Sequence, residues 1–486
     1  MASAQQFNEQ LVSDSVEPIE SARTYQHFEF LVSVLERGAD LIAITLAASL
    51  AYWVYTLLQV GTRTHYSTSI VIAVGFLFAV TFVGLLDHEG GYELANSLLR
   101  IRETERVLRV ATQTFAIAFC VTFFFPHCVS RWVVALATMF VPLLLVAEKQ
   151  LFVGFVRYLH ARGYGIQRVL VYGAGSTGRR VFSALVSSPK MGLDPVGFVD
   201  DSHGLAGHRV FQYGYKHQQS APVIVGPINH ELIRKWGVNL VIVAIPSLAK
   251  ERLNEIASMV SASGATVAFV PQLSFDTEAQ TGYVILDGLL IASLAPGGGR
   301  RVYQALKRVF DFTISLILLV LALPVWVILA LLIRCDSKGP VFFQQRRIGT
   351  RGKPFQLYKF RTMFTHAPRF GFHPTTPDDP RITRVGRWLR RTSLDELPQL
   401  INIIKGDMSL VGPRPEMPFI VDQYSRGHRR RLEVIPGLTG LWQLSADRRF
   451  LIHENIQYDL YYIRNRNFFM DMAILFHTVV FAMQGM

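Results

Sequence analysis

Long apolar runs alternate with short polar segments in the first third of the chain. Runs of about 20 residues, the length that a helix needs to cross a bilayer, cover residues 39–60, 69–86, 110–129 and 132–159. We therefore predict a bundle of four transmembrane helices over residues 37–160, preceded by a polar N-terminal tail over residues 1–36. The polar start lacks the basic region and cleavage site of a signal peptide, so no segment is expected to be removed.

Arginines in the connections between these runs predict the orientation of the bundle. Four arginines lie between the second and third runs and three follow the fourth run, whereas each of the other two connections has one. Because positively charged loops stay in the cytoplasm, we place both ends of the bundle there. The chain is 50% hydrophobic and 17% charged, a balance that indicates an integral membrane protein rather than a soluble one.

The pattern changes after the fourth run, where short apolar strands alternate with helical segments. Gly173, Gly175 and Gly178 form a GxGxxG sequence between a strand and a helix, and Asp200 ends the next strand. This order is typical of a dinucleotide-binding unit, so residues 165–275 are predicted to form a Rossmann-like α/β domain. The segment is short for a complete dinucleotide-binding fold, which leaves nucleotide binding open. Residues 276–300 are expected to be a linker.

The Rossmann-like domain also leaves a second function open, that of a membrane-anchored NAD-dependent nucleotide-sugar dehydratase or epimerase, or of a nucleotide-sensing regulator. Such oxidoreductases need a Tyr-x-x-x-Lys pair, and Tyr303 and Lys307 have this spacing. The pair opens directly onto another apolar run, however, so we interpret Lys307 and Arg308 as anchors to lipid headgroups.

The apolar run over residues 309–333 is long enough to cross the bilayer, but its surroundings favour a different topology. Lysines and arginines flank it on both sides, which favours two cytoplasmic ends, and Pro324 near its middle favours a bend. We predict a re-entrant helix that enters and leaves the membrane by the cytoplasmic face. An ordinary fifth span is the alternative.

The net charge of +13 is concentrated after this run. Residues 341–391 contain twelve lysines and arginines against two acidic residues, which indicates an anionic partner. Nucleic acid, lipid headgroups and a phosphorylated small molecule are candidates, and a membrane-tethered chain favours the last two, so we expect no nucleic-acid partner. The three cysteines have no spacing that indicates a disulfide framework or a metal site.

Two adjacent carboxylates, Asp395 and Glu396, follow this basic segment in the sequence RTSLDELPQL. One explanation is a capping box, in which Ser393 and Glu396 begin a helix. Pro398 would then lie inside the helix, where proline is poorly tolerated. A catalytic role for the two carboxylates is the alternative.

Several unusual motifs then recur in order after residue 301: GPVFFQQRRIG, LYKFRTM, the segment around LDELPQL, GDMSLVGPRPE and PGLTGLWQL. In these motifs the chain resembles the polyprenyl-phosphate sugar-1-phosphate transferases, the monotopic phosphoglycosyl transferases of bacteria. The resemblance covers residues 301–486 and implies a C-terminal monotopic α/β catalytic domain. Four membrane helices and a Rossmann-like domain upstream are similar to the large form of that family.

The resemblance implies transfer of a hexose 1-phosphate, glucose or galactose phosphate, from a UDP-hexose to undecaprenyl phosphate, with release of UMP. It places the enzyme in the bacterial inner membrane with its catalytic domain on the cytoplasmic face, and it implies a role in starting exopolysaccharide, capsule or O-antigen synthesis. Homo-oligomerisation stays open.

The resemblance also implies roles for residues. Asp395 would be the nucleophile that forms an aspartyl-linked phosphosugar, and Glu396 would hold Mg²⁺, which prefers oxygen ligands. Cations expected to contact phosphate are Lys359, Arg361, Arg381, Arg387 and Arg414. Because Arg381, Arg384, Arg387 and Arg390 recur every three residues, we also expect them on one face of a helix, where some would bind lipid headgroups instead.

Overall fold

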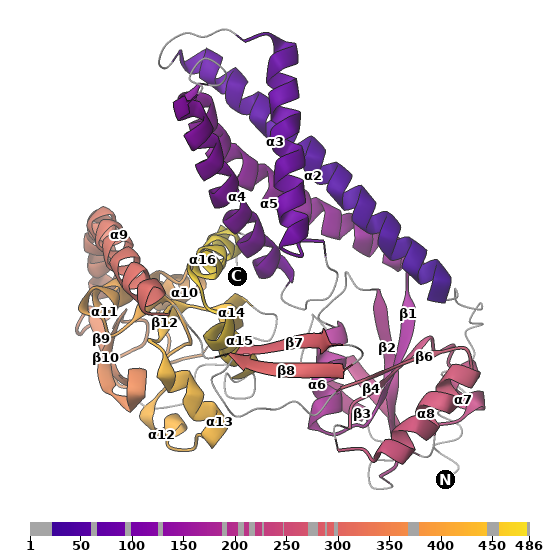
Figure 1. The fold of residues 1–486 in the computed structure, drawn as a ribbon. Helices are drawn as coiled ribbons and strands as arrows, with labels where there is room; N and C mark the ends of the chain where they lie inside the picture. Colours follow the sequence, from indigo (N-terminus) through magenta and orange to yellow (C-terminus); the bar gives the residue numbers. More distant parts are fainter. Residues whose placement is uncertain are drawn as a thin grey trace. The chain divides into compact units, whose positions relative to one another are not determined.

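The computed structural model describes residues 22–59, 66–92, 99–124, 130–186, 192–202, 209–212, 219–225, 228–245, 247–270, 280–286, 289–295, 300–367, 379–444 and 456–483. The chain forms two compact units, Met1–Phe275 and Asp276–Met486 (Figure 1). Each unit is described by itself below.

Four long helices begin the first unit: α2 (Ala22–Leu58), α3 (Thr68–His88), α4 (Leu99–Phe124) and α5 (Arg131–Ala161). Each is long and apolar enough to cross a membrane, yet only 28% to 33% of its most apolar window is buried. Ile44, Phe82, Val110 and Leu145 contribute to the core between the helices, whereas many other apolar side chains, among them Leu77, Phe123 and Leu151, are exposed. Apolar surface of this extent requires an apolar environment, so this is a membrane protein.

Two of the helix starts differ from the prediction. Helix α2 begins at Ala22, inside the segment expected to be a tail. Its early turns are stabilised because Val32 and neighbouring side chains pack against Phe152 and Val156 of α5. Helix α4 begins at Leu99, so the arginines expected in a loop lie on its first turns. Amphipathic turns of this kind have too few apolar residues to be recognised as membrane spans.

The remainder of the first unit is a six-stranded sheet with the strand order β3-β4-β2-β1-β5-β6. Its strands are β1 (Gln167–Tyr172), β2 (Leu193–Asp200), β3 (Arg209–Gln212), β4 (Gln219–Val225), β5 (Leu240–Val243) and β6 (Thr266–Phe269). All neighbours are parallel except β3, which is antiparallel to β4. Helices α6 (Ser176–Val186), α7 (His230–Lys235) and α8 (Lys250–Ala262) follow strands β1, β4 and β5.

Both faces of this sheet are buried, as expected for parallel strands. Alternate residues of β1 enter different clusters: Val169 and Val171 pack with Phe182 of α6, and Leu170 and Tyr172 pack with residues of α7 and α8. The parallel-sheet domain predicted from the alternation of strands and helices is therefore present.

The second unit begins with an antiparallel hairpin of β7 (Gln280–Leu286) and β8 (Leu289–Ala295), in the segment expected to be a linker. Helix α9 (Arg300–Asp336) follows, then the hairpin of β9 (Phe342–Ile348) and β10 (Pro354–Phe360), joined by η3 (Thr350–Gly352).

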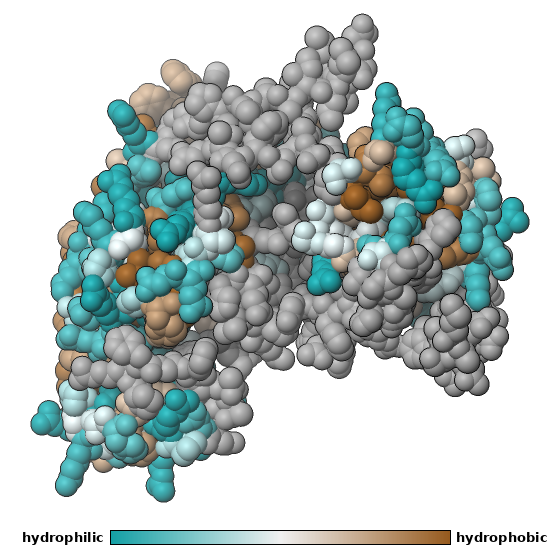
Figure 2. All heavy atoms as spheres, turned by 90° about the horizontal axis from the view of Figure 1, so that it is seen from below, coloured by the Kyte–Doolittle hydropathy of each residue, from teal (hydrophilic) through white to brown (hydrophobic). Residues whose placement is uncertain are grey.

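Short elements complete the second unit. They are α10 (Arg384–Arg391), η4 (Leu394–Glu396), α11 (Gln399–Lys405), β11 (Ser409–Val411), α12 (Pro418–Val421), α13 (Arg426–Arg429), η5 (Arg430–Glu433), β12 (Gly437–Thr439), α14 (Leu441–Leu444), α15 (Ile456–Asn465) and α16 (Phe468–Met483). Strands β11 and β12 pair in parallel. Seen from below, the described surface is largely hydrophilic (Figure 2), in contrast to the outward apolar side chains of the long helices.

Among the five described helices that could cross a membrane, α9 contains the most apolar 18-residue window, and only 11% of that window is buried. Near its start, Arg308 donates to the carbonyl oxygens of Ile403 (2.6 Å) and Ile404 (2.8 Å). Near its end, Leu329 and Ile333 pack in one cluster with side chains that include Leu397. A straight helix would separate residues 308 and 333 by about 37 Å, so α9 bends between these contacts, where Pro324 lies.

The cations at the start of α9 are engaged inside the unit, so their interpretation as headgroup anchors is wrong. Lys307 lies 2.8 Å from Asp471 of α16 and 3.9 Å from Asp311, and Arg308 holds the last carbonyls of α11. Tyr303 also donates to Asp471, at 2.7 Å. The Tyr-x-x-x-Lys pair therefore ties α9 to α16 and has no catalytic geometry.

A buried ion pair connects α2 with α5 in the first unit. The Lys149 ammonium lies 2.9 Å from Glu36 and 2.8 Å from Asp40, and all three side chains are at most 5% exposed. The Tyr92 hydroxyl donates to the same Asp40 oxygen at 2.6 Å. Lys149 is thus the cation that balances two carboxylates in an apolar bundle.

Lys149→Met should destabilise the helical bundle strongly. The substitution leaves Glu36 and Asp40 buried without their cation, and breaking such a pair costs about 3–5 kcal/mol. Thermal unfolding in detergent micelles would measure the loss. Lys250→Met, at the exposed first residue of α8, is the matched control and should leave the melting temperature near that of the wild type. Equal melting temperatures for the two variants would contradict this role of Lys149.

Candidate active site

The segment that carries Asp395 and Glu396 is a tight turn between two helices. Helix α10 ends at Arg391, Ser393 adopts a left-handed conformation with φ of 57°, and Leu394–Glu396 forms a 3-10 turn. Ser393 makes no side-chain cap hydrogen bond, so the capping-box explanation is wrong. Pro398 lies just before α11 rather than inside it. Leu394 and Leu397 pack into the cluster beneath the turn, which fixes the two acids between them.

Two cations from other segments meet these carboxylates. The Lys359 ammonium, on β10, lies 2.7 Å from Glu396 Oε1 and 3.6 Å from Asp395 Oδ2. The Arg414 guanidinium, from the loop after β11, lies 3.2 Å from the same Glu396 oxygen. The fold therefore brings together four of the residues predicted from the sequence.

The two adjacent carboxyl groups have opposite pKa shifts. Burial raises the pKa of Asp395, which is 7% exposed, and the adjacent charge of Glu396 adds to this, although Lys359 opposes both. Burial alone would also raise the pKa of Glu396, but Lys359 and Arg414 outweigh it and lower that pKa to about 2. Glu396 is thus held firmly ionised, while the charge of Asp395 is poorly compensated.

Two further arginines lie near the carboxylates: Arg347 was not predicted to bind phosphate, and Arg390 was expected only as one of four arginines on a helix face. Arg347 of β9 is largely shielded from solvent, with 13% of its side chain exposed, and this burial together with the charge of Arg414 lowers its pKa to about 10. Burial also lowers the pKa of Arg390, although Asp395 opposes the shift. With Lys359 and Arg414, four cations surround two carboxylates, so the site is suited to an anionic ligand.

Three other arginines were predicted to bind phosphate, and two of them have partners within the second unit. Arg361 is buried and donates to the carbonyl oxygens of Ser337 (2.6 Å) and Lys338 (2.8 Å), at the end of α9. Its contacts are those of a residue that caps a helix. Arg381 pairs with Asp379 at 2.6 Å and precedes α10, so the expected arginine face does not include it. Arg387 is exposed on α10.

A magnesium ion fits the chemistry of this site to a limited extent. Among the described residues no group of three or more acidic, histidine or cysteine side chains could hold a metal by itself. Mg²⁺ is, however, often bound by one or two carboxylates together with substrate phosphates. Glu396, which both cations contact at Oε1, is the residue that would hold such an ion.

The glycine-rich loop of the first unit has part of the geometry of a nucleotide site. Gly173 has φ of 106°, and a Cβ on Gly178 would lie 1.7 Å from the Gly173 carbonyl oxygen, so both positions require glycine. A Cβ on Gly175 would meet nothing within 4 Å. Asp200, which would contact a ribose in a dinucleotide site, instead accepts a hydrogen bond from the backbone of Ala174 at 2.7 Å.

Comparison with known proteins decides the family. Residues 302–485 match the family described as bacterial sugar transferase, and residues 88–271 match one described as CoA-binding domain. A UDP-glucose:undecaprenyl-phosphate glucose-1-phosphate transferase of Xanthomonas campestris pv. campestris is 31% identical over 349 residues, which cover 69% of this chain and 70% of that protein. The chain belongs to the bacterial sugar transferase family.

Other relatives in the family agree on the class of enzyme. A protein of Klebsiella pneumoniae with the same name as the Xanthomonas enzyme is 30% identical over 67% of this chain and 69% of its own length. An undecaprenyl-phosphate galactose phosphotransferase of Salmonella typhimurium is 29% identical over 66% of this chain and 69% of its length. This sugar transferase is therefore an enzyme, and the oxidoreductase alternative is not favoured.

The opposite pKa shifts predict an unusual effect on stability. Because burial raises the pKa of Asp395 in the folded protein, its ionised form destabilises the fold at any pH above the ordinary aspartate pKa. Asp395→Asn should therefore raise the melting temperature at pH 7. The gain should shrink as the pH falls towards about 4, where the wild-type carboxyl becomes protonated in both states.

Thermal unfolding between pH 4 and pH 8 tests this expectation, with Asp422→Asn, an exposed acid of the same unit, as the matched control. A helix-start role for Asp395 makes the opposite prediction, since an acid in a first turn stabilises a helix. A melting temperature that falls in Asp395→Asn at pH 7 would support that role and contradict the shift.

Proposed function

We propose that this protein transfers hexose 1-phosphate from a UDP-hexose to undecaprenyl phosphate and releases UMP. The single observation that carries the proposal is the pair of adjacent carboxylates, buried Asp395 and partly buried Glu396, among Lys359, Arg414, Arg347 and Arg390. Joining a diphosphate to a lipid phosphate brings several negative charges together, and such a reaction depends on positioned cations. Glucose and galactose are the hexoses in the names of the relatives above.

The first step assigns the nucleophile to Asp395. One of its carboxylate oxygens attacks the β-phosphorus of the UDP-hexose, the bond from that phosphorus to the bridging oxygen breaks, and UMP leaves with the electron pair. A carboxylate whose charge is poorly compensated is the more reactive of the two, and this supports Asp395 over Glu396 for this role.

The second step regenerates the carboxylate. An oxygen of undecaprenyl phosphate attacks the same phosphorus, and the bond to Asp395 breaks. Lys359 and Arg414 keep Glu396 ionised beside the phosphates throughout, and Glu396 is the residue that would hold Mg²⁺. When bound, that ion would reduce the repulsion between the phosphates.

The lipid acceptor explains the bend in α9. Because both ends of α9 contact the same unit and its apolar side chains face outwards, we propose that α9 enters the membrane and returns to the same face. The catalytic unit then lies on the cytoplasmic face of the bacterial inner membrane, with α2 to α5 as a transmembrane bundle. We propose that residues 37–160 contain the membrane-spanning bundle, residues 165–275 the α/β domain and residues 301–486 the catalytic domain.

Release of UMP tests the reaction. Purified protein in detergent should release UMP from UDP-glucose or UDP-galactose over many turnovers only when undecaprenyl phosphate is present in excess of the enzyme, because without the acceptor the reaction stops after about one UMP per enzyme. Asp395→Asn should lose at least about 10³-fold in kcat, because the amide lacks an anionic oxygen to attack phosphorus. Glu396→Gln should be impaired in a way that depends on Mg²⁺ concentration. Asp422→Asn should retain wild-type turnover.

Trapping the intermediate separates the nucleophile from its neighbours. UDP-hexose labelled in the β-phosphate, supplied without lipid acceptor, should leave label on denatured wild-type protein, and peptide mapping should locate it on Asp395. Absence of label together with an active Asp395→Asn variant would remove Asp395 from the mechanism. Absence of UMP release from the wild type would reject the reaction itself.

The topology of α9 has its own test. In a background without native cysteines, Lys338→Cys should react with a membrane-impermeant maleimide only after spheroplasts are lysed. Ser130→Cys, before α5, should react in intact spheroplasts because the bundle places it outside. Labelling of position 338 in intact spheroplasts would mean that α9 crosses the membrane.

A further inference from the structure

The loop that carries Arg414 has an unusual backbone. Pro413 and Pro415 flank Arg414, so two of three consecutive residues lack an N–H group. At the start of the loop, Gly412 packs so closely against another segment that a Cβ would lie 2.5 Å from the carbonyl oxygen of Ile435. At its end, the backbone N–H of Ile348 donates to the carbonyl oxygen of Glu416 (2.9 Å).

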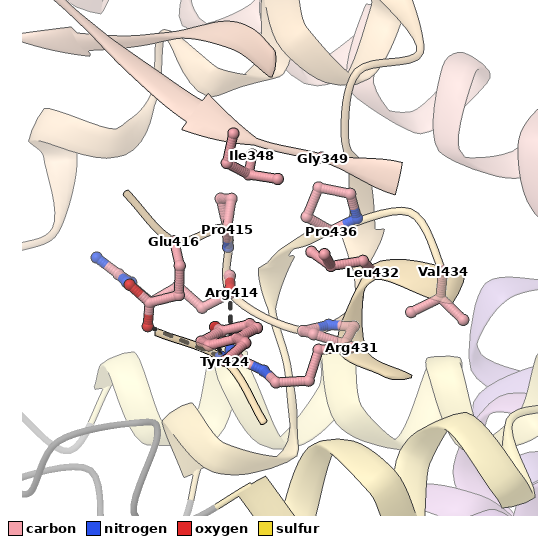
Figure 3. A pocket seen from close by; sticks show the side chains of 11 residues that line it. Ile348, Gly349, Arg414, Pro415, Glu416, Tyr424, Arg431, Leu432, Val434 and Pro436 are labelled. Carbon is pink, nitrogen blue, oxygen red and sulfur yellow. Dashed lines mark hydrogen bonds and ion pairs between the residues drawn. The ribbon is translucent and has the colours of Figure 1, made fainter. Parts of the chain in front are cut away.

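Two guanidinium groups, one buried and one partly buried, donate to carbonyl oxygens inside this loop. Arg431 donates to the carbonyl oxygen of Arg414 at 3.1 Å, and Arg347 donates to that of Pro415 at 3.1 Å. Figure 3 shows Arg431 and Tyr424 next to Arg414 and Glu416 in the small pocket behind the loop. Arg431 therefore holds the backbone of Arg414, the residue whose side chain contacts Glu396.

Arg431 is itself fixed by partners on both sides. Its Nε donates to Asp459 of α15 at 2.7 Å, its Nη1 donates to the Tyr424 hydroxyl, and the same Nη1 lies 3.9 Å from Glu416. The side chains of Arg431 and Asp459 are each 3% exposed. A continuous chain of contacts therefore runs from Asp459 through Arg431 to the Arg414 backbone, and from the Arg414 side chain to Glu396.

We propose that Arg431 is a positioning residue for the transfer reaction, which acts by holding the Arg414 backbone so that the Arg414 side chain meets Glu396. The inference rests on the proposed function, because it concerns the same site. It requires arginine rather than lysine: the planar fork reaches Asp459, Tyr424 and a carbonyl oxygen at once, whereas an ammonium on a flexible stem cannot fix all three.

The test compares Arg431→Lys in two backgrounds, the wild type and Arg414→Ala. In the wild type, Arg431→Lys keeps a charge beside Asp459 but loosens the loop, and kcat should fall about 10- to 100-fold, as small misplacements in active sites do. In Arg414→Ala, whose residual turnover is the reference, the same substitution should cost less than about 2-fold, because the side chain that Arg431 positions is gone.

Two further variants keep the test decisive. Arg429→Lys, an exposed neighbour on α13, is the matched control and should retain wild-type turnover. If Arg431→Lys does not yield folded protein, Tyr424→Phe replaces it: this variant removes one contact of Arg431 and should show a smaller loss with the same dependence on Arg414. Equal losses in the two backgrounds, or wild-type turnover in Arg431→Lys, would overturn the proposal.

Hydrogen–deuterium exchange separates this proposal from the proposed function. Peptides that cover residues 408–417 should exchange faster in Arg431→Lys than in the wild type or in Arg429→Lys. If the wild type released no UMP, the proposed function would fail, and exchange would decide alone whether Arg431 holds the loop. Unchanged exchange in these peptides would overturn the positioning role whatever the turnover.

Discussion

Two carboxylates on consecutive residues share one set of cations, and the properties of the site depend on how those charges are divided. Both close contacts of 3.2 Å or less from Lys359 and Arg414 go to Glu396, whereas the Lys359 ammonium is 3.6 Å from Asp395. Neighbouring carboxyl groups in different environments can take different roles. The unequal division makes one acid a stable anion and leaves the other, more deeply buried, with a poorly compensated charge.

This division requires precise placement of side chains from distant segments. Lys359 comes from a hairpin, Glu396 from a 3-10 turn between two leucines, and Arg414 from a loop with two prolines. Two arginines satisfy the carbonyl oxygens of that loop, and Arg308 and Arg361 do the same for the ends of α11 and α9. Much of the positive charge therefore stabilises backbone, and only part of it faces the carboxylates.

The sequence alone was sufficient for some of these features and insufficient for others. The acidic pair, Lys359 and Arg414 were predicted from motifs, and the parallel sheet from its alternating strands. Arg361 was expected to contact phosphate together with Lys359 because both lie in the motif LYKFRTM, but β10 ends at Phe360 and the Arg361 side chain donates to carbonyl oxygens at the end of α9. The roles of Arg347 and Arg431 depend on partners 68 and 17 residues away in sequence, which no local pattern reveals. The hairpin of β7 and β8 had a usable signal, the Asp287-Gly288 pair between two largely apolar segments.

The most direct test of the account is the ionisation of each carboxyl group in the intact protein. Infrared spectra of protein labelled with ¹³C in aspartate or glutamate carboxyl groups, compared with those of Asp395→Asn and Glu396→Gln, would isolate the two titrations. We predict that Glu396 stays ionised until the pH approaches 2, whereas Asp395 takes up its proton at a pH above the ordinary aspartate range. Ordinary values for both groups, or a Glu396 that is protonated before Asp395 as the pH falls, would contradict the division of charge from which the mechanism is derived.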